Sequence, residues 1–137
     1  MKDYSNQAQY EFSKRLAQFV EVNGSITEKD EAILYAQALE LQLLKAPQTA
    51  VFPAMDQFNV QYNNGSYKVS GYVDSQNSYG ASIRTPFTVN INKNSGSWSC
   101  TDKFISTGAN AFSYAIIFWI LGILGSIIMY FIFMNSI

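Results

Sequence analysis

Histidine is absent from this chain of 137 residues, and Cys100 is its only cysteine. A single thiol cannot form an intrachain disulfide, and a Cys/His zinc site needs ligands that the chain does not supply. Mechanisms that depend on an imidazole acid or base are excluded as well. Because no histidine is available to activate it, we interpret Cys100 as an inert strand residue and not as a nucleophile.

Charged residues are few, at 14% of the chain, and nine Lys and Arg are balanced by ten Asp and Glu. No basic stripe results, so nucleic-acid binding is disfavoured. Isolated acids such as Asp56 and Asp74 do not provide the paired carboxylates of a hydrolase or the ligand set of a metal site. The sequence therefore predicts a protein that is not an enzyme and holds no metal or cofactor.

A long uncharged stretch lies in the last third of the chain. Residues 111–134 read AFSYAIIFWILGILGSIIMYFIFM, without a charge or a proline. At about 1.5 Å per residue this length crosses a hydrocarbon core of ~30 Å as one tilted helix. We predict a transmembrane helix here, after a short linker over 106–110. Gly122, Gly125 and Ser126 place small residues in mid-span, and the Gly122/Ser126 spacing favours close helix packing and self-association.

The segment from Met1 to Gly24 is polar throughout and contains no apolar region of the kind that a signal peptide needs. Lys103 precedes the uncharged stretch, and no basic residue follows it. By the positive-inside rule we expect a tail-anchored, single-pass membrane protein, with the lipid bilayer as one partner and the N-terminal domain in the cytoplasm. The alternative is a domain translocated without a signal.

Two helices are predicted at the start of the chain. An amphipathic helix within 1–24 carries one apolar stripe, with Lys14 and Arg15 directed away from it, and ends at Asn23-Gly24. A second helix is N-capped by Ser25 or Thr27 and runs to about Lys45. The apolar stripe of the first helix consists of Ala8, Phe12, Leu16, Phe19 and Val20.

After Pro53 the apolar residues alternate with polar ones, as in β-strands. Strands before and after Asn64-Gly65 form a predicted hairpin. A third run over 83–91 contains Pro86, which indicates an edge strand or a bulge, and Ser97–Ile105 is a fourth strand. Residues 25–105 thus form a small α+β domain that follows the amphipathic helix of residues 1–24. The predicted fold is an N-terminal helix pair followed by a four-stranded antiparallel meander, with the second helix covering one face. The predicted core comprises Phe12, Leu16, Leu39, Leu43, Val69, Val73, Phe87 and Val89.

The connection between the second and third strands, Asp74 to Gly80, is rich in polar side chains. Asp74 and Arg84 are placed to form a directional ion pair that orders the connection. On a second interpretation the connection is a recognition surface, where Arg84 takes an acidic group and Tyr79 supplies an amphipathic contact. The candidate partner-binding residues are Asp74, Gln76, Asn77, Tyr79 and Arg84.

Two segments resemble a small uncharacterised domain of bacterial and prophage proteins. Residues 45–53 are similar to its pattern K-x-P-x-T-A-x-F-P, and residues 71–84 to its pattern G-Y-V-D-x-Q-N-x-[FY]-G-A-x-[IV]-R. The resemblance covers roughly Ala38 to Ser99. It implies a compact extracytoplasmic or membrane-associated module without an assigned reaction, although here the predicted anchor follows the domain instead of preceding it.

Taken together, these features favour a membrane-tethered module that binds a protein partner, as an adaptor or a subunit of a membrane complex. The alternative is a small membrane-acting effector, of a phage or defence type, that oligomerises through its transmembrane helix.

Overall fold

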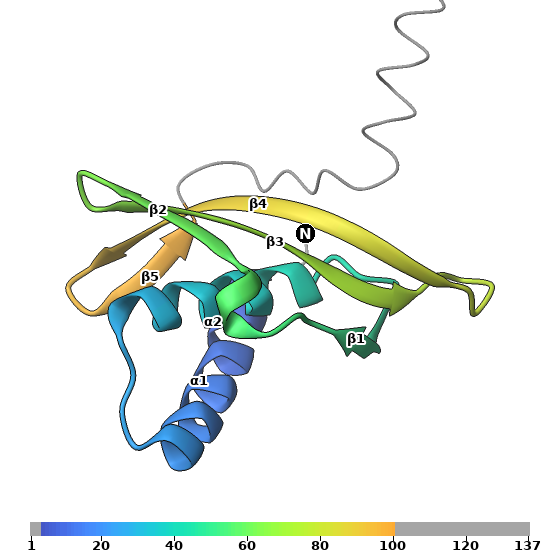
Figure 1. Cartoon of the computed structure of the whole chain (residues 1–137), viewed down its shortest axis with the longest axis horizontal. Helices are drawn as coiled ribbons and strands as arrows, with labels where there is room; N and C mark the ends of the chain where they lie inside the picture. The colour runs from blue at the N-terminus through green and yellow to red at the C-terminus, as the bar shows by residue number, and fades with distance from the viewer. Residues whose placement is uncertain (1–3, 101–137) are drawn as a thin grey trace, which may run out of the picture. The chain divides into compact units, whose positions relative to one another are not determined.

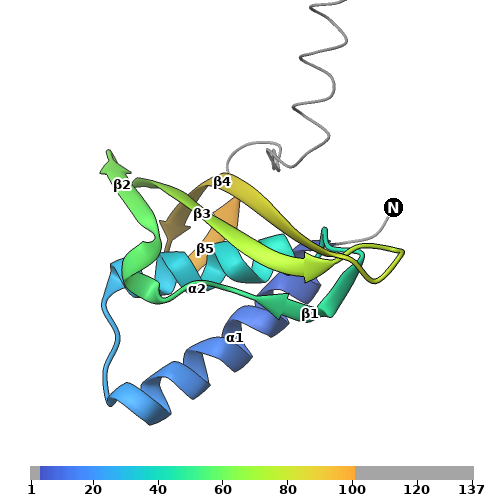
Figure 2. The same cartoon turned by 45° about the vertical axis from the view of Figure 1, so that its right-hand side comes forward.

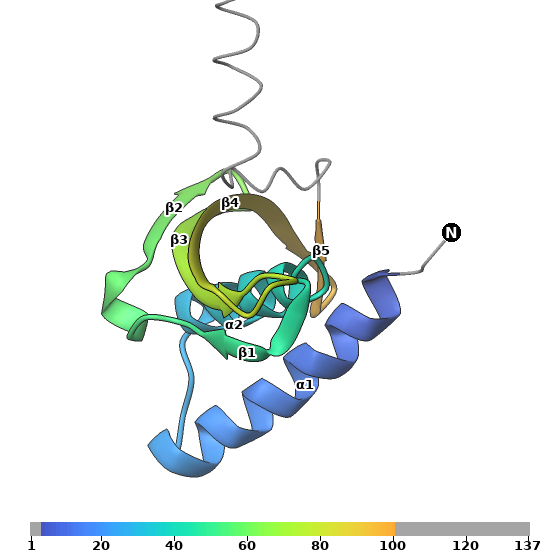
Figure 3. The same cartoon turned by 90° about the vertical axis from the view of Figure 1, so that its right-hand side faces the viewer.

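Helix α2 (Glu28–Leu41) lies on the concave side of a strongly curved antiparallel sheet in the computed structural model (Figure 1, Figure 3). The structure describes residues 4–100, which belong to one compact unit. The predicted linker and transmembrane helix, with Gly122, Gly125 and Ser126, lie outside these residues. Within residues 4–100, neither helix is long and apolar enough to cross a membrane.

The other helix, α1 (Tyr4–Asn23), packs on the side of α2 that faces away from the sheet (Figure 2). A single 3-10 turn, η1 (Met55–Gln57), precedes the second strand. The strands are β1 (Ala46–Val51), β2 (Asn59–Asn63), β3 (Ser66–Gln76), β4 (Ser82–Asn94) and β5 (Ser97–Cys100). The predicted α+β class, with two helices followed by an antiparallel sheet, is therefore confirmed.

Strands β2, β3, β4 and β5 pair in chain order, as the predicted meander requires. The predicted number of four strands is wrong, because β1 adds a fifth beside the second half of β3. Only Ala46↔Gln76 and Val51↔Asp74 are in register, with an irregularity between them. Strand β1 forms by pairing with a strand distant in sequence, and its own residues show little alternation of polar and apolar side chains. The sequence around Ala46-Pro47 therefore predicted the end of a helix and not a strand.

Helix α2 begins as predicted and ends early. The Thr27 side chain accepts a hydrogen bond from the Asp30 backbone N–H at 3.2 Å, which makes Thr27 the N-cap. The helix ends at Leu41 and not near Lys45, because Gln42 and Leu43 already form turn hydrogen bonds. Leu43 therefore leaves the helical face and is 44% exposed, so its predicted place in the core is wrong.

Two-residue turns determine the register of both outer hairpins. Asn64 and Gly65 both have positive φ, 48° and 84°, as a type I′ turn requires, and Asn63 pairs with Ser66 beside them. The described part of strand β5, Ser97–Cys100, pairs with Ile91–Asn94 of β4. Pro86 of β4 lies opposite Tyr72 of β3 in an unbroken register, so the pairing of these two strands contains no bulge at the proline.

The core lies between α2 and the concave face of the sheet. Phe12 of α1 meets Tyr35 edge to face, and Tyr35 stacks on Trp98 of β5. Of the predicted core residues, Phe12, Val69, Val73, Phe87 and Val89 are buried, while Leu16 and Leu39 are partly buried. Arg15 does not point away, because it donates to Gln37 Oε1 at 3.0 Å and lies over the Phe52 ring. Burial lowers the pKa of Arg15.

Candidate functional site

Asp74 and Arg84 face each other across β3 and β4 on the convex side of the sheet. Arg84 Nε and Nη2 donate to the two Asp74 carboxylate oxygens at 2.8 and 2.9 Å, and the guanidinium lies 4.0 Å from the Tyr72 ring centroid. The Arg84 hydrogen bond lowers the pKa of Asp74. The predicted ion pair therefore forms, and its two parallel hydrogen bonds join β3 to β4 at this point.

The predicted connection is shorter than Asp74 to Gly80, because β3 continues to Gln76. Gln76 donates its backbone N–H to Thr49 Oγ1 at 2.9 Å, which attaches the end of β3 to β1. The Asn77 side chain accepts hydrogen bonds from the Tyr79 and Ala81 backbone N–H groups, at 2.9 and 3.0 Å. Asn77 thus shapes the turn, as Asn side chains commonly do.

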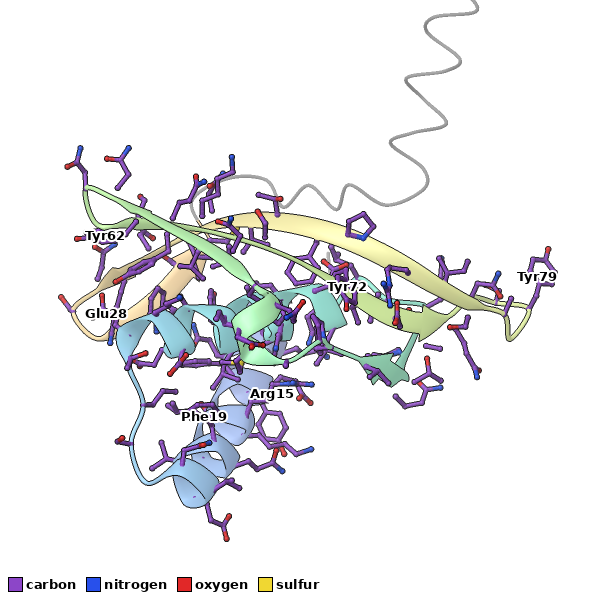
Figure 4. All side chains as sticks on the ribbon, in the orientation of Figure 1. Arg15, Phe19, Glu28, Tyr62, Tyr72 and Tyr79 are labelled. Atoms are coloured by element: carbon purple, nitrogen blue, oxygen red, sulfur yellow. The ribbon has the colours of Figure 1, made fainter. Side chains whose placement is uncertain are left out.

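Tyr79 stands at the end of this turn with 94% of its surface exposed (Figure 4). Its backbone is fixed through Asn77, so the ring is presented from an ordered position. The structure therefore divides the candidate residues into two groups. Asp74, Gln76 and Arg84 lie on the convex face at the strand ends, and Asn77 and Tyr79 form the turn beyond them. We refer to these five residues, together with Tyr72, as the β3–β4 tip.

Glu40 is a buried acid that the sequence analysis did not single out. It is 1% exposed, and neither carboxylate oxygen has a hydrogen-bond partner in the described part of the chain. Loss of solvation raises the pKa of Glu40 to about 8. The burial of Glu40 could have been predicted from the sequence, because Ile33, Ala36 and Glu40 lie on one face of the predicted helix. A carboxyl in this setting holds its proton at neutral pH.

A second charged cluster joins the start of α2 to the sheet. Lys93 Nζ lies 3.1 Å from a Glu31 carboxylate oxygen and 3.9 Å from one of Glu28. The Tyr67 hydroxyl donates a hydrogen bond to a Glu28 carboxylate oxygen at 2.6 Å, and this bond raises the pKa of Tyr67 to about 12. These contacts hold α2 against β3 and β4, so we interpret them as structural.

A metal-binding group is not found in residues 4–100, where no three His, Cys, Asp or Glu side chains gather. A surface hollow of about 370 Å³ lies between the helices and is lined by Asn6, Gln7, Tyr10, Glu11 and Gln42. Among the described residues that line it, Glu11 is the one charged side chain.

Comparisons with protein-family models, with curated proteins and with solved structures give no match. Function therefore has to be inferred from the geometry of this chain.

Proposed function

We propose that this protein is a tail-anchored, single-pass membrane protein whose α+β domain binds a protein partner at the cytoplasmic membrane surface. It acts as an adaptor or as a subunit of a membrane complex, and not as an enzyme. The β3–β4 tip is the binding surface. The observation that carries this proposal is the almost complete exposure of the Tyr79 ring on an ordered turn.

The geometry of the tip favours recognition. Tyrosine is enriched among residues that dominate binding energy, because its ring offers apolar area and a polar hydroxyl. Asn77 and the Asp74/Arg84 pair fix the turn and the strands beneath it before any partner arrives. A pre-ordered surface loses little conformational entropy on binding, and this raises affinity.

The membrane part of the proposal is supported by the sequence of residues 111–134. Twenty-four residues without a charge are long enough to span a bilayer and have no polar face to expose to water. The five linker residues, 106–110, reach only ~10–15 Å, so the domain would work close to the lipid surface.

Site-specific photo-crosslinking tests the binding surface. A photoreactive amino acid at Tyr79 of the full chain is expected to give one dominant adduct in cells, which excess unlabelled wild-type chain suppresses. The matched control carries the same amino acid at Asn94, an exposed residue beside the turn of the β4–β5 hairpin. Equal adducts from both positions, or none from Tyr79, would contradict the proposal.

The second candidate is a membrane-acting effector that oligomerises through its transmembrane helix. Gly122, Gly125 and Ser126 favour it, because small residues allow close helix packing in lipid. A chain that ends at Gly108 separates the two functions. The effector would lose its effect on the membrane, whereas the binding module would keep its Tyr79 adduct, provided that the shortened chain is folded.

A further inference from the structure

The β2 strand is an unusually unprotected edge of the sheet. Exposed edges invite pairing with another chain, and proteins usually guard them with proline, charge, irregular pairing or short length. Strand β1, the other strand that pairs with this side of β3, contains Pro47 and a register shift. Strand β2 reads Asn-Val-Gln-Tyr-Asn, without charge or proline, and all five residues pair regularly with β3.

The turn at Asn64-Gly65 determines which backbone groups of β2 point outward. In a hairpin with a two-residue turn, the residues that flank the turn exchange both hydrogen bonds. Asn63, and with it Gln61 and Asn59, therefore directs its N–H and C=O groups to β3. Val60 and Tyr62 direct theirs to the open side, where none of the described strands lies.

We propose that this edge pairs with the same edge of a second copy, antiparallel and about a two-fold axis at Gln61. In that register Val60 lies opposite Tyr62 of the second copy, and Tyr62 lies opposite its Val60. The outward N–H and C=O groups of one copy thus meet those of the other and form four hydrogen bonds. Because both copies use the same residues, the contact closes into a dimer and joins two sheets into one.

The side chains fit this pairing on both faces. On the convex face Gln61 meets Gln61 of the second copy, and Asn59 meets Asn63, so amides face amides and no like charges oppose each other. On the other face, the Tyr62 ring is 64% exposed, and Val60 of the second copy would cover part of it (Figure 4). A cross-strand pair of an aromatic and a β-branched side chain is favourable.

Five residue pairs bury too little surface for a dimer that is stable in dilute solution. A membrane tether changes this balance, because it confines the copies and raises their effective concentration. The pairing therefore rests on the proposed membrane anchoring for its strength, although not for its geometry. On this proposal, one partner of the domain is a second copy of the same chain.

Disulfide trapping in the full chain tests the register. Gln61 lies opposite itself at a non-hydrogen-bonded position, where Cα atoms are ~4.5 Å apart and a disulfide fits. In a Cys100→Ser background, membranes that contain Gln61→Cys should give on the order of tenfold more oxidised dimer than membranes that contain Gln48→Cys. Gln48 is the matched control, since it is exposed on the β1 edge. Equal yields of oxidised dimer from Gln61→Cys and Gln48→Cys, with both thiols reactive towards a maleimide, would overturn the pairing. A crosslink of Gln61→Cys only to another protein would also overturn it.

Charge variants test the same axis without a cysteine. Gln61→Lys places two lysines face to face beside Lys68 of each copy, so copurification of two differently tagged Gln61→Lys chains should fall severalfold. Mixing Gln61→Lys with Gln61→Glu chains should restore it, and a failure to restore it would contradict the two-fold register.

Carbonate extraction of the same membranes separates this proposal from the anchoring. A chain that resists extraction but gives no Gln61→Cys dimer would overturn the pairing alone. A dimer formed by chains that carbonate releases would support the pairing and overturn the anchoring.

Discussion

The ring of Phe58 occupies the place where residue 71 would carry a side chain. A Cβ built on Gly71 would lie 2.5 Å from two ring atoms of Phe58, Cδ1 and Cε1. Phe58 is buried and also contacts the Phe87 ring, which stands opposite Gly71 on β4. The glycine is thus required by close approach of a core aromatic to the middle of β3.

We therefore expect Gly71→Ala to lower the free energy of unfolding by about 1–3 kcal/mol, because the added methyl group displaces the Phe58 ring. Urea unfolding followed by tryptophan fluorescence measures the change. In a Phe58→Ala background the same substitution should cost much less, since the space is then open. An equal cost in both backgrounds would show that the ring is not the cause.

Glu40 should make the domain less stable as pH rises. Its folded pKa of about 8 lies above the ordinary value of 4.5, so the folded state holds a proton that the unfolded state releases between these values. The contribution of Glu40 to stability is therefore fully present below pH 4.5 and is lost as pH rises towards 8, by roughly 3–5 kcal/mol in total. Urea unfolding of the full chain in detergent, at pH 5 and pH 8, measures this loss.

Glu40→Gln should remove most of this pH dependence and raise stability at pH 8, because the amide does not ionise. The matched control is Glu21→Gln, an exposed glutamate of α1, which should leave the dependence intact. A wild-type curve that is flat between pH 5 and pH 8 would show that Glu40 is solvated in the folded state.

Tyr79 and Asn77 should respond to substitution in opposite ways. Tyr79→Ser should change stability by less than about 0.5 kcal/mol, since the ring is exposed, and should still abolish partner binding. Asn77→Ala removes two hydrogen bonds from the turn and should lower stability by about 1 kcal/mol. Thermal unfolding and the crosslink yield, measured on the same variants, separate a contact residue from a structural one.

Local chemistry explains what the sequence could predict. Asn64-Gly65 adopts the backbone of a type I′ turn almost regardless of context, so the hairpin and its register followed from two residues. The Thr27 cap and the Asp74/Arg84 pair were likewise accessible, because each depends on a few residues at fixed spacing.

Distant contacts explain what it could not predict. Strand β1 exists because β3 lies beside it, and its own residues show little strand pattern. Arg15 was expected on the outer face of α1, yet Gln37 and Phe52 provide partners that only the folded chain brings near. Glu40 was overlooked because a glutamate in a helix is usually solvated.

The proposed function depends on a domain tethered to the cytoplasmic side of a membrane, and one labelling measurement tests this directly. Ser13, an exposed residue of α1, is replaced by cysteine in a Cys100→Ser background, and intact cells receive a membrane-impermeant maleimide. We predict no labelling until the cells are permeabilised, together with retention of the chain in carbonate-washed membranes. Labelling of Ser13→Cys in intact cells, or release of the chain by carbonate, would contradict the account.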